Sequence, residues 1–136
     1  MFAKPSTDGF LPALPGIARK TLVHGKHTLS TEFRMKAGSV LPAHSHPHEQ
    51  TGYLVSGHVR VTIADEHFDA APGASWCIPP NVLHGAEILE DTVAIEIFSP
   101  VREDYLPARD HVAADSEDDG ALLLHDLVAG GTRSVG

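Results

Sequence analysis

The chain has 136 residues, carries a formal net charge of -8 and is 42% hydrophobic. This length fits one domain, and the hydrophobic content is sufficient for a buried core, which excludes a wholly disordered chain. The acidic balance leaves no basic surface for a phosphate backbone, so we expect no nucleic-acid partner. A single cysteine and the lack of a long apolar run predict a cytoplasmic protein without membrane contact.

Residues 1–23 are rich in proline and glycine, and we expect them to form an N-terminal arm. Apolar and polar residues then alternate over 29–36, 53–63 and 92–98, and a short apolar segment lies at 75–78. Alternation with a period of two is typical of half-buried strands. The dipeptide Ser56-Gly57 interrupts the second of these segments, which predicts either a hairpin or a sharp bend within one strand.

The predicted fold is all-β, with a single barrel over residues 24–106 and an acidic tail at 107–136. The apolar stretch 121–128 within this tail predicts a short element that docks on the barrel or on a partner subunit, and a disordered tail is the alternative. Barrels of this size usually cover exposed sheet faces by pairing, so we expect a homodimer, with residues 1–23 reaching across.

The segment HSHPHEQ at 44–50 holds three histidines and a glutamine. His44 and His46 are two residues apart, so on an extended strand their imidazoles point to the same side and can share one metal ion. Gln50 follows across a predicted turn, and His84 follows a Pro-Pro-Asn turn that a barrel can bring beside His44. We expect His48 at the pocket rim or in the turn rather than among the ligands.

The spacing of these residues resembles the two halves of the cupin signature, which here read Gly38, His44, His46, Gln50 and Gly57, then Gly73, Pro79 and His84. The resemblance implies a small jelly-roll barrel, or double-stranded β-helix. Its inner wall would bind one divalent transition metal, Zn, Ni, Mn, Fe or Cu, through His44, His46, Gln50 and His84. Gln50 stands where glutamate is common, so all four ligands are neutral and the metal charge should attract a small anionic substrate.

The segment TVAIEIF at 92–98 permits two interpretations. One buries the face formed by Val93, Ile95 and Ile97 and leaves Glu96 in water. The other covers both faces of the strand, so that Glu96 and Phe98 point into the metal cavity. Phe98 favours the second interpretation, because a large aromatic side chain is poorly placed in water.

These segments are also similar to the cupins of pectin and uronate breakdown, which linearise a 4,5-unsaturated uronate monomer. The resemblance implies that Glu96, Phe98 and Arg102 serve the reaction and that Arg102 binds the substrate carboxylate. Arg60 is a second candidate for that carboxylate if the polar face of its strand lines the cavity, and a solvated face is the alternative. The predicted function is the linearisation of a small anionic sugar acid by Lewis-acid and proton-transfer chemistry. A metal-dependent dioxygenase and a non-catalytic binding protein are the alternatives.

Overall fold

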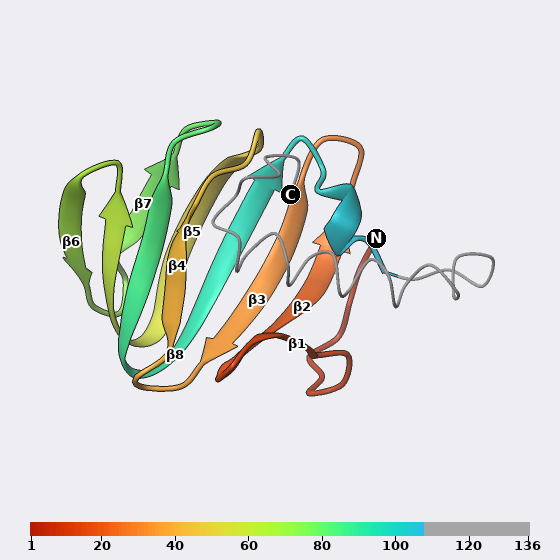
Figure 1. The fold of residues 1–136 in the computed structure, drawn as a ribbon. Coiled ribbons are helices and arrows are strands. Elements are labelled where there is room, and N and C mark those ends of the chain that lie inside the picture. Colours follow the sequence, from red (N-terminus) through yellow and green to blue (C-terminus); the bar gives the residue numbers. More distant parts are fainter. Residues whose placement is uncertain (108–136) are drawn as a thin grey trace.

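The computed structural model describes residues 1–107, and within this range the chain is all-β apart from one 3-10 turn. The strands are β1 (Leu11–Leu14), β2 (Ile17–His24), β3 (Leu29–Met35), β4 (Val40–His44), β5 (Glu49–Ile63), β6 (Glu66–Ala70), β7 (Ser75–Ile78) and β8 (His84–Ser99), and η1 spans Glu103–Tyr105 (Figure 1). All the strand pairs are antiparallel. The predicted all-β class is therefore confirmed.

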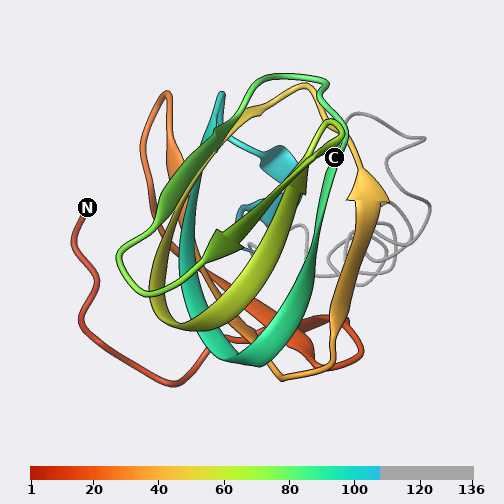
Figure 2. The same ribbon diagram turned by 90° about the vertical axis from the view of Figure 1, so that its left-hand side faces the viewer.

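The two long strands β5 and β8, of 15 and 16 residues, pair with each other along nearly their whole length. The first part of β8 also pairs with β4, and its second part pairs with β3. Strand β5 in turn pairs with β7 near its start and with β6 near its end. Each long strand thus pairs with different partners along its two halves, and the sheet curls strongly upon itself (Figure 2).

The interruption at Ser56-Gly57 is a bend within β5, where the register with β8 shifts repeatedly between Leu54 and Val59. Gly57 has φ 101°, a backbone conformation that side chains other than glycine rarely adopt. A Cβ at this position would also lie 2.5 Å from the carbonyl oxygen of Asp91. Of the two alternatives, the bend is therefore right and the hairpin wrong.

The sheet begins earlier than the sequence analysis predicts. Residues 11–23, expected to belong to an arm, lie mostly in β1 and β2, and β2 pairs with β3 from Ile17 to His24. The side chains of Ile17 and Arg19 are both buried. The proline and glycine residues around β1 hide this strand signal, because they break the short alternating pattern on both sides.

Strand β8 presents Ala94, Glu96 and Phe98 to the interior, whereas Ile97 on the opposite face is 38% exposed. The interpretation that buries Val93, Ile95 and Ile97 is therefore wrong, and Glu96 and Phe98 do point inward. The physical reason is that the interior holds a polar site beside its apolar core, so that one buried strand face carries Glu96 together with Ala94 and Phe98. The buried apolar residues are Ala13, Leu14, Ile17, Leu29, Phe33, Met35, Leu54, Val59, Val61, Ala70, Ile78, Ile88, Ala94, Phe98 and Tyr105.

The predicted tail element at 121–128 lies outside the described residues. Within residues 1–107, no helix has the length and apolar character needed to cross a membrane.

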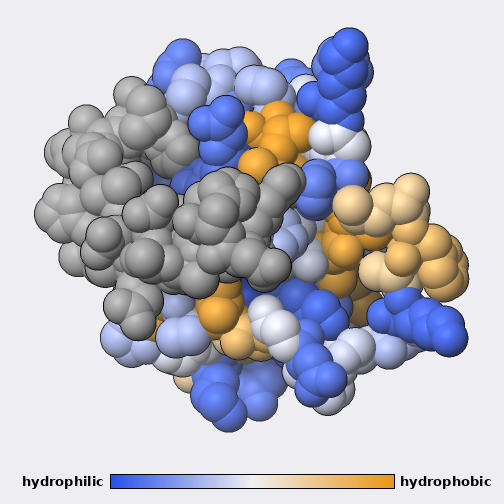
Figure 3. Space-filling view, turned by 90° about the vertical axis from the view of Figure 1, so that its right-hand side faces the viewer, coloured by the Kyte–Doolittle hydropathy of each residue, from blue (hydrophilic) through white to orange (hydrophobic). Residues whose placement is uncertain are grey.

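Figure 3 views the side of the molecule that carries β1 and β2, and its hydrophobic residues form small groups separated by hydrophilic ones.

Candidate metal centre

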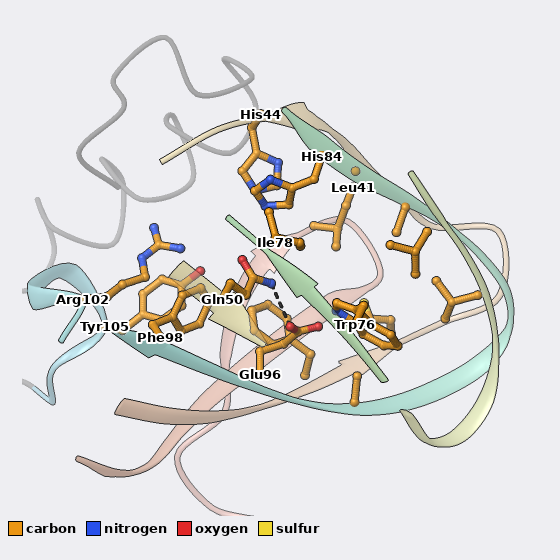
Figure 4. Close-up of a pocket in the computed structure, with 17 residues that line it drawn as sticks. Leu41, His44, Gln50, Trp76, Ile78, His84, Glu96, Phe98, Arg102 and Tyr105 are labelled. Carbon is orange, nitrogen blue, oxygen red and sulfur yellow. Dashed lines mark hydrogen bonds between the residues drawn. The ribbon is translucent and has the colours of Figure 1, made fainter. Parts of the chain in front are cut away.

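Three buried histidines meet at one end of the barrel. His44 ends β4 and His84 begins β8, and the two residues are direct partners in the strand pairing. Their ring centroids lie 4.3 Å apart, and the ring of His46 lies 4.8 Å from that of His84. The candidate ligand atoms of the three residues all lie within 4.8 Å of one another. The structure therefore brings the two remote sequence segments together as predicted (Figure 4).

Each of the three imidazoles has its Nδ1 atom beside a backbone carbonyl oxygen. The distances are 2.8 Å from His44 to Pro42, 3.0 Å from His46 to His48 and 2.8 Å from His84 to Val82. A carbonyl oxygen only accepts hydrogen bonds, so Nδ1 carries the hydrogen and Nε2 keeps a lone pair. Nε2 of His84 is buried without a hydrogen-bond partner in the described part of the chain. This arrangement is typical of histidines that bind a metal through Nε2.

Gln50 is oriented with its amide oxygen toward this cluster. Oε1 of Gln50 lies 2.9 Å from Nε2 of His46, and the amide nitrogen donates a hydrogen bond of 2.8 Å to Oε1 of Glu96 (Figure 4). Since His46 donates from Nδ1, both facing atoms carry lone pairs. Two lone pairs at this separation repel one another unless a positive charge lies beside both. The local geometry therefore suits an amide oxygen that binds a cation.

Burial keeps the imidazoles neutral. It lowers the pKa of His46 to about 3, with further lowering from Arg102 and the two neighbouring histidines. It also lowers the pKa of His84 to about 4, and the pKa of His44 moves in the same direction. Neutral imidazole is the form that binds a metal, so no proton has to leave at neutral pH. The donor set fits a divalent transition metal, and it does not distinguish among Zn, Ni, Mn, Fe and Cu.

Glu96 lies behind Gln50 and is 8% exposed. Burial raises the pKa of Glu96 to about 7, and the hydrogen bond from Gln50 and the neighbouring Trp76 oppose part of this rise. A carboxyl group with this pKa is present in both protonation states near neutral pH. Glu96 can therefore accept and return a proton within the site.

A narrow cavity joins these groups. Its wall is apolar on the side of β3 and of the second half of β5, and polar around the histidines. Phe98 packs edge-on against His46, with ring centroids 5.7 Å apart. Arg102 also lines the cavity, with its guanidinium 5.0 Å from the centroid of the Phe98 ring. The three residues Glu96, Phe98 and Arg102 thus line one cavity together with His44, Gln50 and His84 (Figure 4).

Arg60 does not reach this cavity, so its predicted contact with a substrate carboxylate is wrong. Its side chain is 48% exposed and lies near Asp69 and Glu87, at 3.4 and 3.8 Å. The reason is the alternation of β5, because the neighbours Val59 and Val61 take the inward positions. His48 lies in the bend after β4, as predicted, but it is buried, and it is not part of the three-histidine cluster.

The sequence analysis did not predict three residues at or beside the site, namely Arg19, Trp76 and Tyr105. Trp76 lines the cavity and helps to lower the pKa of Glu96, and Tyr105 lines the cavity beside Arg102. Arg19 packs on the far side of the Tyr105 ring, at 4.0 Å from its centroid. The signal for Arg19 is its place in the alternation of β2, where it occupies an inward position next to Ile17. Trp76 and Tyr105 have no comparable signal. The local sequence does not distinguish an aromatic residue that lines a site from one that packs in the core.

The fold and the histidine cluster define the class of protein. The model of the Cupin domain family matches residues 31–99, about half of the chain, and the chain belongs to this family. Among particular relatives, the pectin degradation protein KdgF of Dickeya dadantii is 30% identical over 93 residues, which cover 67% of this chain and 84% of that protein. The oxalate decarboxylase OxdC of Bacillus subtilis is 29% identical over 85 residues, but the match spans only 22% of its length.

Solved structures agree with this assignment. The structure of KdgF from a Halomonas species matches with a TM-score of 0.74 and 32% sequence identity, covering 78% of this chain and 98% of that chain. An RmlC-like cupin from Shewanella frigidimarina matches with a TM-score of 0.73 and 27% identity, covering 77% of this chain and 95% of that chain. The chain is therefore a cupin domain protein that resembles KdgF.

Proposed function

We propose that this protein is a metal-dependent enzyme that converts a 4,5-unsaturated uronate monomer into its open-chain keto form. The observation that supports it most is the placement of Glu96, a buried carboxyl group that is hydrogen-bonded to Gln50 at 2.8 Å beside the histidine cluster. The similarity to the pectin degradation protein KdgF, at 30% identity over most of the chain, points to the same substrate class.

His44, His46, His84 and the amide oxygen of Gln50 would hold the metal ion. A bound divalent metal would supply Lewis-acid polarisation of a substrate oxygen. Arg102 would hold the substrate carboxylate, because a guanidinium matches the two carboxylate oxygens in geometry and charge. Phe98, 1% exposed, forms a rigid wall that keeps water away from the ring of the substrate.

The proposed reaction is an isomerisation, so it needs no second reactant. The proton of the C1 hydroxyl leaves and the bond from C1 to the ring oxygen breaks, which produces an aldehyde at C1 and an enolate at C5. Carbon C4 then gains a proton and the enolate becomes a ketone. Glu96 would accept the first proton and return one to C4, a role that its pKa of about 7 suits.

Glu96→Gln tests this proposal, because the amide retains an acceptor for the Gln50 hydrogen bond and removes the titrating group. We expect the metal content to stay within twofold of the unmodified protein and turnover of the unsaturated uronate to fall by about 100-fold or more. Loss of the ultraviolet absorbance of the C4–C5 double bond measures turnover. Glu87→Gln, an exposed change on the same strand, is the matched control and should leave the rate unchanged.

The result also separates the alternatives. An unchanged rate in Glu96→Gln would overturn the role of Glu96. Uronate binding without any product in the unmodified, metal-loaded protein would instead indicate a binding protein. Oxygen consumption that requires Fe(II) or Cu(II) and a small organic substrate would indicate a dioxygenase.

A further inference from the structure

The ring of Tyr105 lies between two guanidinium groups. The central guanidinium carbon of Arg19 is 4.0 Å from the ring centroid, and that of Arg102 is 3.9 Å from it. Two guanidinium groups cannot occupy the same face at this distance, so they lie on opposite faces of the ring. Arg102 faces the cavity, whereas Arg19 comes from β2 and does not line it.

This stack, formed by Arg19, Tyr105 and Arg102, holds more positive than negative charge. Arg102 forms an ion pair with Asp104, with Nη2 at 2.8 Å and Nε at 3.3 Å from its oxygens. Arg19 is 4% exposed, forms no ion pair with a described residue, and its Nε has no hydrogen-bond partner within residues 1–107. The carboxylate of Asp104 is therefore the one counter-charge paired within the stack, among the described residues, against the two buried cations of Arg19 and Arg102. A buried cation without a full partner is costly to the fold, so its presence calls for a counter-charge from elsewhere.

The stack also fixes the position of the cation that faces the cavity. The hydroxyl of Thr21, on β2, donates to the backbone carbonyl oxygen of Tyr105, so the same strand that carries Arg19 anchors η1. Asp104 engages Nε and Nη2 of Arg102, which leaves the Nη1 side for a ligand oxygen. The guanidinium is thus oriented before a ligand arrives.

We propose that Arg19 is a positioning residue of the carboxylate-binding site, and that the ligand carboxylate is the counter-charge which the stack lacks. Arg19 supports Arg102 through the ring of Tyr105 and adds its own positive field to that of Arg102. This inference rests on the proposed function for the choice of a uronate as ligand. It assigns a functional role to the N-terminal strand β2, which contributes none of the proposed metal ligands.

Binding of D-galacturonate to the metal-loaded protein, measured by calorimetry, tests the inference, and uncharged D-galactose is the comparison ligand. In Arg19→Met we expect the affinity for galacturonate to fall about tenfold or more, because a charge near the carboxylate is lost. Arg19→Lys restores the charge and should recover most of the affinity. Arg34→Met removes a 48% exposed arginine from neighbouring β3 and should change nothing.

The melting temperature and metal content of each variant separate this role from a merely structural one. We expect the metal content to stay close to that of the unmodified protein and the melting temperature of Arg19→Met to stay level or rise, since the change removes a buried cation that has no ion pair among the described residues. Unchanged galacturonate affinity in Arg19→Met would overturn the inference, as would equal affinity for galactose. If Arg19→Met does not fold, the folded Arg19→Lys variant serves as the test. An affinity of this variant for galacturonate that is as low as its affinity for galactose would also overturn the inference.

Turnover of the unsaturated uronate, followed in the same samples, distinguishes the two proposals. Galacturonate binding that depends on Arg19, without any turnover, supports this inference and overturns the proposed function. Turnover with a KM that Arg19→Met leaves unchanged supports the proposed function and overturns this inference.

Discussion

The position of one hydrogen atom decides what each histidine of the cluster can do. Backbone carbonyls of Pro42, His48 and Val82 accept the Nδ1 hydrogens of the three rings. Because these partners belong to the backbone, substitution of the neighbouring side chains leaves the tautomer in place. The neutral rings and the amide oxygen of Gln50 then present electron pairs to one point, which is what a divalent transition metal requires.

His84 is the sharpest residue with which to test the metal site, since its Nε2 is buried without a partner in the described chain. His84→Ala should lower metal affinity by at least about 100-fold, more than the loss of an outer-shell partner. Competition with a chromophoric chelator measures the affinity. His67→Ala, an exposed histidine on β6, is the control. Equal affinity in the two variants would exclude His84 as a ligand.

The low pKa values predict how metal binding depends on pH. His46 and His84 gain protons only near their pKa values of about 3 and about 4, well below the ordinary value of 6.5. Metal affinity should therefore stay level as pH falls from 8 to 5, and it should decrease below about 4. The measurement is made in Glu96→Gln, because this variant lacks the carboxyl group whose pKa of about 7 lies within the same pH range. A fall in affinity centred near pH 6.5 would contradict the assigned burial.

The same values predict the pH dependence of stability for the metal-free protein. The unfolded chain takes up protons on these histidines below pH 6.5, whereas the folded chain resists uptake until its lowered pKa values are reached. The free energy of unfolding should thus be highest above pH 6.5 and should fall progressively toward pH 4. Urea unfolding at several pH values, again in Glu96→Gln, measures this slope. A stability that rises on acidification would contradict it.

At the scale of elements, the bend in β5 places the site. Strands β5 and β8 each pair with different partners along their two halves, and Gln50 and Glu96 fall near each other in one half, whereas His84 lies in the other. The bend depends on Gly57, whose φ of 101° and close approach to Asp91 both exclude a side chain. The site therefore depends on a residue that contacts none of its ligands.

Gly57→Ala should reduce the free energy of unfolding by about 2 kcal/mol or more, since the added carbon meets both strain and crowding. Gly73→Ala is the matched control, because Gly73 also has a positive φ, 95°, but no atom lies within 4 Å of an added Cβ. Chemical denaturation compares the two variants. If both lose the same free energy, crowding at the bend contributes nothing.

At the scale of the whole molecule, the site ties separate parts of the chain into one structure. The proposed ligands come from β4, the turn after it, β5 and β8, and the stack adds β2 and η1. A metal bound by residues of β4, the following turn, β5 and β8 would stabilise only the folded state. The homodimer stays a prediction. Tyr53 and Val55 lie about half exposed on the outer face of the sheet, where a partner subunit could cover them.

Metal addition should accordingly raise the melting temperature of the metal-free protein, by an amount that grows with metal concentration. At 1,000 times the dissociation constant the gain is about 4 kcal/mol in the free energy of unfolding. Differential scanning calorimetry measures the shift, and His84→Ala should abolish most of it. An equal shift in that variant would indicate metal binding elsewhere on the molecule.

The sequence by itself determined the class of fold and the three-histidine cluster, because alternation and motif spacing are local properties. Leu29, Thr31, Phe33 and Met35 share the buried face of β3, as their period of two predicts. Two histidines two residues apart and a third after a proline turn were also enough to predict a cluster, although His46 lies just past the end of β4 rather than on one strand with His44. The direction of the Glu96 side chain could not be predicted in this way. Its strand has one apolar face and one mixed face, and only the site inside the barrel decides which of the two is buried.

Only the tertiary structure decided which arginine side chains are buried. Arg60 and Arg19 both sit in alternating strands, yet Arg60 points outward and Arg19 is buried behind Tyr105. Alternation states that neighbours face opposite ways, but it does not state which face encloses the interior. That choice depends on how the whole sheet curls and on what its distant strands pack against, which no local pattern contains.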